Sequence, residues 1–178
     1  MILLVKVATI WLSGCSGCHM SFLDQDEKII ELAEKIELVY SPIVDIKDFP
    51  EDVDITLVEG AVANEEQLHQ LKIIRERTKL LIAFGDCAVT GNVVALRNMF
   101  QDSVKEVLER AYVENVDYNQ QYPTQVPRLL KNAYPLHEIV KVDFYLPGCP
   151  PSAELINYVL KELLDGRTPS LEGRFKFG

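Results

Sequence analysis

Four cysteines carry the strongest chemical signal in this chain, and it contains no others. Cys15 and Cys18 form a C-x-x-C pair, whereas Cys87 and Cys149 stand alone. Each lies in a glycine-containing turn that follows an apolar run of strand character and precedes a helical pattern. Four thiolates are the ligand set of structural zinc and of iron–sulfur clusters. We therefore expect these four side chains to form one metal site.

The spacing of the cysteines favours an iron–sulfur cluster over zinc. Structural zinc sites usually use two close pairs, such as two C-x₂-C motifs, whereas this chain has one pair and two isolated cysteines. A cubane cluster takes its ligands from separate loops readily, since each thiolate binds a different iron. Two alternatives remain open: a zinc-stapled interaction module, and four buried structural cysteines that act as small hydrophobes.

The first motif also fits two kinds of stand-alone redox carrier. Residues 15–19 (CSGCH) match the C-x-x-C-H signature of haem c attachment. A C-x-x-C pair after a strand also fits a thioredoxin-like redox motif. Both interpretations leave Cys87 and Cys149 unexplained, and haem attachment would require export as well.

Alternating strand and helix patterns predict how these turns are positioned. The predicted strands cover residues 3–12, 37–45, 54–62, 79–86 and 140–146. Helical patterns between them predict an α/β fold with a parallel sheet. Pro42 moves the second strand to an edge, so we expect the flavodoxin-like order 2-1-3-4-5 with helices on both faces. Ligands of such sheets bind at the carboxyl edge, where the strand order reverses.

We expect residues 1–178 to form a single flavodoxin-like, cluster-binding domain, because that length suits one core. The helix after the first motif is expected near Ser21, which could form a capping box with Asp24. Residues 112–140 are rich in tyrosine, proline and amides and predict an irregular excursion.

Composition excludes several partners. The 27 acidic and 18 basic residues give a net charge of −9, which disfavours nucleic acid. No apolar run approaches the roughly 20 residues of a transmembrane helix. Residues 12–15 (LSGC) resemble a lipoprotein cleavage box, but Lys6 interrupts the apolar run before it. We expect a cytoplasmic chain with reduced thiols.

Other residues are candidates for a supporting role around the metal. Glu59 ends the third strand, where it could support the site, relay protons or bind iron, or else cap a helix. His19 follows the C-x-x-C pair and could donate a hydrogen bond to sulfur. The cysteine turns also contain Gly14, Gly17 and Gly148, which let the backbone approach closely.

Three motifs resemble the small subunit of [NiFe]-hydrogenases, and more narrowly that of cytoplasmic bidirectional NAD-reducing hydrogenases. They are residues 11–21 (WLSGCSGCHMS), 85–91 (GDCAVTG) and 146–151 (LPGCPP). The resemblance covers nearly the whole chain, including residues 59–62 (EGAV) and 112–118 (YVENVDY). The related complex I subunit has adjacent cysteines in the first motif, whereas this chain spaces them C-x-x-C.

The resemblance implies that Cys15, Cys18, Cys87 and Cys149 bind one proximal [4Fe–4S] cluster. It implies an electron-transfer subunit of a hydrogen:NAD⁺ oxidoreductase complex that is not catalytic for H₂ alone. The implied partners are a Ni–Fe large subunit and a diaphorase module with further Fe–S clusters, FMN and NAD. A ferredoxin- or deazaflavin-linked hydrogenase is the alternative. A flavodoxin-like sheet can hold FMN, but no nucleotide-binding motif supports it here.

Overall fold

Five strands form one parallel sheet in the computed structural model, which describes residues 4–177. Their order is β2-β1-β3-β5-β7, with each neighbouring pair parallel. Numbered along the chain, these are the five predicted strands in the predicted order. Their bounds are Val5–Trp11 (β1), Ile36–Tyr40 (β2), Val53–Glu59 (β3), Thr78–Phe84 (β5) and Phe144–Leu146 (β7).

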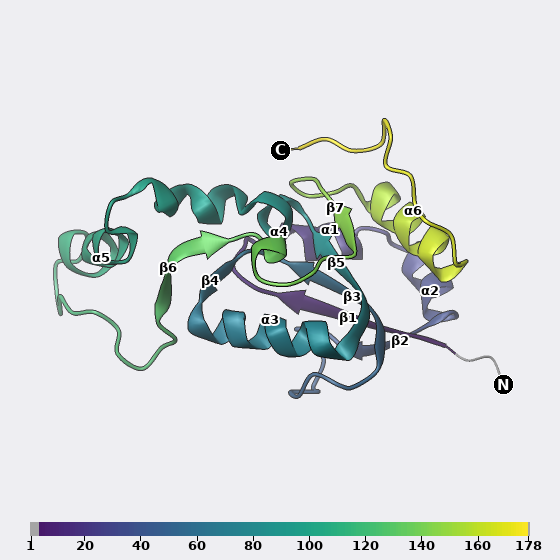
Figure 1. Cartoon of the computed structure of the whole chain (residues 1–178), viewed down its shortest axis with the longest axis horizontal. Helices are drawn as coiled ribbons and strands as arrows, with labels where there is room; N and C mark the ends of the chain where they lie inside the picture. The colour runs from purple at the N-terminus through teal and green to yellow at the C-terminus, as the bar shows by residue number, and fades with distance from the viewer. Residues whose placement is uncertain (1–3, 178) are drawn as a thin grey trace.

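Helices cover both faces of this sheet, as the sequence predicted (Figure 1). Apolar side chains of α1, α2 and α6 pack on one face, and those of α3 and α4 pack on the other. The α-helices are Gly17–Leu23 (α1), Lys28–Ala33 (α2), Glu65–Arg77 (α3), Asp86–Thr90 (α4), Ser103–Glu109 (α5) and Ala153–Leu164 (α6).

Strand β5 shows how one segment serves both layers of the core. Leu81 and Ala83 pack with the α3 layer, whereas Ile82 and Phe84 pack with the α6 layer. Because successive side chains of a strand point to opposite faces, an uninterrupted apolar run is what a sheet covered on both sides requires. The uninterrupted apolar sequence of β5 is therefore typical of a central strand that is covered on both faces.

The predicted irregular excursion contains more regular structure than we expected. Residues Leu129–Tyr134 form β6, which pairs antiparallel with β4 (Val62–Asn64) in a separate two-stranded sheet. Three short helical segments accompany this sheet: η1 (Asn92–Met99), η2 (Arg110–Glu114) and η3 (Leu136–Glu138). The prediction holds for residues 115–128, which contain no helix or strand.

The predicted helix near Ser21 begins four residues earlier, at Gly17, and is broken into α1 and α2. The expected capping box is wrong, because the Ser21 hydroxyl donates to the carbonyl of Pro151 instead. The first motif thus lies partly inside a helix, with Cys18 in its first turn.

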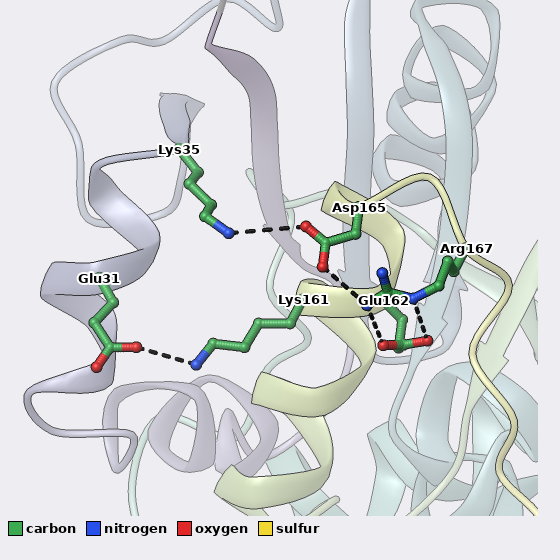
Figure 2. Close-up of polar contacts among 6 residues, drawn as sticks. All are labelled: Glu31, Lys35, Lys161, Glu162, Asp165 and Arg167. Carbon is green, nitrogen blue, oxygen red and sulfur yellow. Dashed lines mark hydrogen bonds and ion pairs between the residues drawn. The ribbon is translucent and has the colours of Figure 1, made fainter.

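Exposed ion pairs link α2 and the residues just after it to the C-terminal end of α6 (Figure 2). Lys161 Nζ lies 3.0 Å from Glu31 Oε2, and Lys35 Nζ lies 3.8 Å from Asp165 Oδ1. Exposed pairs of this kind contribute at most about 1 kcal/mol each. The apolar contacts beneath them, including Leu32, Ile156 and Leu160, hold this layer together.

Candidate metal centre

The carboxyl edge of the parallel sheet carries all four cysteines. Cys15 lies in the loop after β1, and Cys18 lies in the first turn of α1. Cys87 lies in the first turn of α4, directly after β5, and Cys149 lies in the loop after β7. Because these strands run in one direction, residues that are up to 134 positions apart reach the same edge.

The four thiols lie within each other's electrostatic field. Burial raises the pKa of the Cys18 thiol well above its usual range, and negative charge on Glu59 and on the other three cysteines raises it further. Burial also raises the pKa of Cys87, with further contributions from Cys149 and Cys15. Such effects weaken with distance, so the four thiols lie near enough to one another for their charges to interact.

The site is closed on one side and open on the other. Cys18 and Cys87 are buried, with exposed fractions of 8% and 9%. Cys15 and Cys149 are exposed. A group bound by all four thiols would therefore reach the protein surface on the side of Cys15 and Cys149.

Two glycines leave room for the tight backbone around the cysteines. Gly85 has φ +83°, and a Cβ there would lie 2.1 Å from the Cys18 sulfur. Gly148 has φ +138°, and a Cβ there would lie 2.6 Å from backbone atoms of Pro151. A side chain at Gly85 would push α1 away from β5, and a side chain at Gly148 would distort its own loop. Both positions also have dihedrals that L-residues rarely adopt.

The two other glycines are less constrained. A Cβ on Gly17 would lie 3.2 Å from the Cys15 sulfur, which is a tight contact. A Cβ on Gly14 would meet Glu59 Oε1 at 3.8 Å and the Gly60 backbone at 3.5 Å, which are ordinary contacts. Gly17 therefore adjoins a candidate ligand directly, whereas Gly14 adjoins the carboxylate behind it.

Glu59 caps the start of α1 from the end of β3. The residue is 2% exposed, and its carboxylate accepts hydrogen bonds from the backbone N–H groups of Cys18 (3.3 Å) and His19 (3.0 Å). The first N–H groups of a helix have no partner within the helix, so the carboxylate supplies one. Of the roles considered for Glu59, the structure shows helix capping, within a buried site.

His19 lies behind the cysteines, with only 8% of its surface exposed. Its Nδ1 pairs with the Glu59 carboxylate, and its ring lies edge-on to Trp11 and near Phe84. Nε2 is buried and has no hydrogen-bond partner among the described residues. Glu59 thus fixes the orientation of the imidazole, and the structure shows no hydrogen bond from His19 to a sulfur within residues 4–177.

Three further polar contacts tie the cysteine loops together, and sequence reasoning missed them. Asn92 Nδ2 donates to the Cys149 sulfur at 3.6 Å. Ser21 connects α1 to the loop after β7, and the Asp86 carboxylate accepts from Gly148 N–H at 2.7 Å. Their partners lie 57 to 130 residues away, so no local pattern could have revealed them.

Four thiolates are the donor set of iron–sulfur clusters. Within residues 4–177, no three cysteine, histidine or carboxylate side chains lie close enough to hold one metal ion. A cubane separates its ligands more widely, since each thiolate binds a different iron. Iron would also compensate the negative charge that raises the thiol pKa values. The four cysteines therefore fit a [4Fe–4S] cluster.

Cys18 is a poor site for covalent haem. Its sulfur lies against Gly85 in the interior, whereas a thioether to haem needs space for the porphyrin. The C-x-x-C-H interpretation is therefore disfavoured by the position of its second cysteine.

Comparison with known proteins shows what this chain is similar to. Residues 15–163 match the family described as NADH ubiquinone oxidoreductase, 20 Kd subunit. The delta subunit of the NAD-reducing hydrogenase HoxS from Cupriavidus necator is 43% identical over 92% of this chain and 80% of that protein. A subunit of the F420-non-reducing hydrogenase vhu from Methanocaldococcus jannaschii is 39% identical over 95% of this chain and 59% of that protein.

The same fold occurs in a solved hydrogenase. A chain in the crystal structure of an NAD⁺-reducing [NiFe]-hydrogenase in the H₂-reduced state superposes with a TM-score of 0.93 and 38% identity. The match covers 99% of this chain and 100% of that chain. In addition, no helix within residues 4–177 is long and apolar enough to cross a membrane.

Proposed function

The chain belongs to the family described as NADH ubiquinone oxidoreductase, 20 Kd subunit, and from this premise we propose that it is the electron-transfer small subunit of an NAD-reducing [NiFe]-hydrogenase complex. The identity to the delta subunit of HoxS and the fold match to an NAD⁺-reducing hydrogenase support this assignment within the family. The observation that carries it is the convergence of four free thiols at the carboxyl edge of the sheet.

Cys15, Cys18, Cys87 and Cys149 would hold one [4Fe–4S] cluster. When bound, such a cluster takes up and releases one electron at a time. Around it, Glu59 orients the start of α1 through the N–H groups of Cys18 and His19. Asn92 donates to the Cys149 sulfur, and hydrogen bonds to sulfur are among the features that set cluster potentials.

The exposed side of the site indicates where an electron partner would approach. Cys15 and Cys149 reach the surface there, and we infer that a large subunit bearing the Ni–Fe site covers them. Electrons would continue to a diaphorase module with further Fe–S clusters, FMN and NAD. Four reduced cysteines at a metal site suit the cytoplasm, where thiols stay reduced.

We further infer that residues 1–178 act as one cluster-binding unit. The two layers of apolar side chains share the strands of a single sheet, which supports one cooperative core. Catalysis of H₂ cleavage itself is assigned to the large subunit, and this chain alone should not split H₂.

Replacing Cys87 by serine tests the proposal. The variant complex should lose or convert one cluster signal and stop H₂-dependent NAD⁺ reduction, because a buried ligand is removed. H₂-dependent reduction of an artificial dye close to the Ni–Fe site should persist, which shows that the large subunit is assembled. Full NAD-linked turnover in Cys87→Ser would contradict the proposal.

A second candidate function follows from the similarity to a subunit of an F420-non-reducing hydrogenase. In that case the chain would pass electrons to an acceptor other than NAD. Purified complex should be supplied with H₂ and either NAD⁺ or oxidised ferredoxin. Reduction of NAD⁺ alone supports the first function, and reduction of ferredoxin alone supports the second.

A further inference from the structure

We propose that Asp86 is a positioning residue that holds Cys87 and Cys149 at the separation one cluster requires. The inference rests on the proposed function, in which these two cysteines are ligands of the same cluster. Asp86 directly precedes Cys87 and is 3% exposed. Its role follows from hydrogen bonds to the residue that directly precedes Cys149.

Asp86 and Gly148 exchange two hydrogen bonds. The Asp86 N–H donates to the Gly148 carbonyl at 3.0 Å. The Gly148 N–H donates to Asp86 Oδ1 at 2.7 Å, in a buried contact between residues 62 positions apart. Both bonds lie one residue before a candidate ligand, so they fix the two ligand-bearing backbones against each other.

The carboxylate replaces a backbone acceptor where the strand ladder ends. Strands β5 and β7 share only three paired positions, ending at Phe84 and Leu146. Beyond them Gly85 N–H still reaches the Leu146 carbonyl at 2.8 Å. Gly148 then turns with φ +138°, and regular pairing stops there. The Asp86 side chain adds one more hydrogen bond between the two segments, to Gly148, directly before the two cysteines.

The opposite end of the same strand pair contains a matched arrangement. Asp143 N–H donates to the Leu81 carbonyl at 3.0 Å, and Leu81 N–H donates to Asp143 Oδ2 at 2.9 Å. Arg75 also binds Asp143, at 2.5 Å. Asp143 lies at the amino edge of the sheet, away from the cysteines. A substitution of Asp143 is therefore the control for removing an aspartate that extends the hydrogen bonding between β5 and β7.

Two substitutions of Asp86 should give different results. Asp86→Asn keeps an oxygen that can accept the Gly148 N–H, so the geometry of the two loops is retained. Asp86→Ala removes the acceptor and leaves a buried N–H without its partner. Only the alanine variant should therefore change the spacing between Cys87 and Cys149.

The test compares the wild-type complex with complexes containing Asp86→Asn, Asp86→Ala and Asp143→Ala. Three quantities are measured: the EPR signal of the reduced cluster, the thermal unfolding midpoint, and hydrogen exchange of the Gly148 amide. The relevant EPR signal is the one that is lost in Cys87→Ser. Asp86→Ala should lose more than half of this signal or shift its g values, and should lose protection of the amide. Asp86→Asn should resemble wild type in both, and Asp143→Ala should lower the midpoint while leaving the signal unchanged.

Two results would overturn the positioning role. One is an Asp86→Ala complex with the wild-type signal and a protected Gly148 amide. The other is the same loss of signal in Asp86→Ala and Asp143→Ala, which would reduce the role to general stability. A wild-type complex without any cluster signal that depends on Cys87 would instead refute the proposed function. In that case amide exchange still reports whether Asp86 holds Gly148.

Discussion

At the scale of single residues, Gly85 shows how closely the two buried cysteine loops approach. A side chain there would meet the Cys18 sulfur, so the absence of a Cβ sets the distance between β5 and the start of α1. The position of the four cysteines at the carboxyl edge could be predicted, because each cysteine motif follows a strand in the sequence. Gly85 belongs to the same turn as Cys87, but its contact with Cys18 is visible only in the fold.

Gly85→Ala should reduce cluster incorporation and stability, because it combines an unfavourable φ with a steric overlap. Gly166→Ala is the matched control, since Gly166 has φ +73° but no atoms within 4 Å of the added Cβ. We expect Gly166→Ala to lose only about 1 to 2 kcal/mol of unfolding free energy, from the left-handed conformation. Iron content and chemical unfolding of the two variants check this. Equal losses of both quantities in the two variants would contradict the steric argument.

Which residues lie near the site could be predicted from the sequence more reliably than which atoms they contact. Glu59 was predictable as a residue at the carboxyl edge because it ends a strand. Its pairing with the backbone of Cys18 and His19 depends on where α1 begins, and α1 begins four residues before the predicted start. The contacts of Asp86 and Asn92 could not be predicted from the sequence, since each residue contacts one that only the parallel sheet brings close.

At the scale of elements, the short strand β7 depends on side-chain acceptors at its ends. Burial would raise the pKa of Asp143, but hydrogen bonds from the Leu81 N–H and from Arg75 outweigh it and hold the pKa below its usual value. The carboxylate therefore stabilises the fold above the unfolded-state pKa of about 3.9. That contribution is lost as the pH falls through the lower, folded-state pKa.

The stability difference between wild type and Asp143→Asn should consequently depend on pH. Near pH 7 we expect wild type to be more stable by about 1 to 3 kcal/mol, the usual worth of hydrogen bonds to a charged group. Below about pH 4 the difference should shrink as wild-type Asp143 takes up a proton. Urea unfolding from pH 2.5 to 7 measures it, and a constant difference across this range would contradict the assigned cause.

The elements that sequence analysis missed lie outside the main sheet. Strand β6 was hidden in a segment rich in proline and tyrosine, and it pairs only with the three-residue strand β4 among the described residues. Side chains from η1 complete this unit: Arg97 donates to the Leu130 carbonyl, and Asn98 exchanges hydrogen bonds with the Ala133 backbone. Strands held by distant side chains lack the alternation or apolar runs that predicted the five main strands.

At the scale of the whole molecule, η1 carries an apolar ridge beside the open side of the site. Val93, Leu96 and Met99 are exposed and three residues apart, so they align on one face of a 3₁₀-helix. We call these residues the η1 ridge. It begins next to Asn92, which contacts Cys149. A partner that covers the exposed thiols would therefore also meet this ridge.

If the proposed large subunit covers the η1 ridge, Leu96→Asp should weaken its binding by about tenfold or more, because the substitution would place a charge in an apolar contact. Ile30→Asp is the control, since Ile30 is similarly exposed (66% against 60%) but lies on α2, away from η1 (Figure 1). Both variants should fold, because neither side chain is buried. Titration of the large subunit against each variant measures the affinity, and equal affinities would exclude the η1 ridge from the interface.

Low-temperature EPR of the reduced complex, with Cys15, Cys18, Cys87 and Cys149 replaced by serine one at a time, tests the central claim most directly. If all four thiols hold one [4Fe–4S] cluster, each substitution should abolish or alter the same signal and leave the other signals of the complex intact. A substitution that leaves this signal unchanged, or two substitutions that alter different signals, would contradict the account.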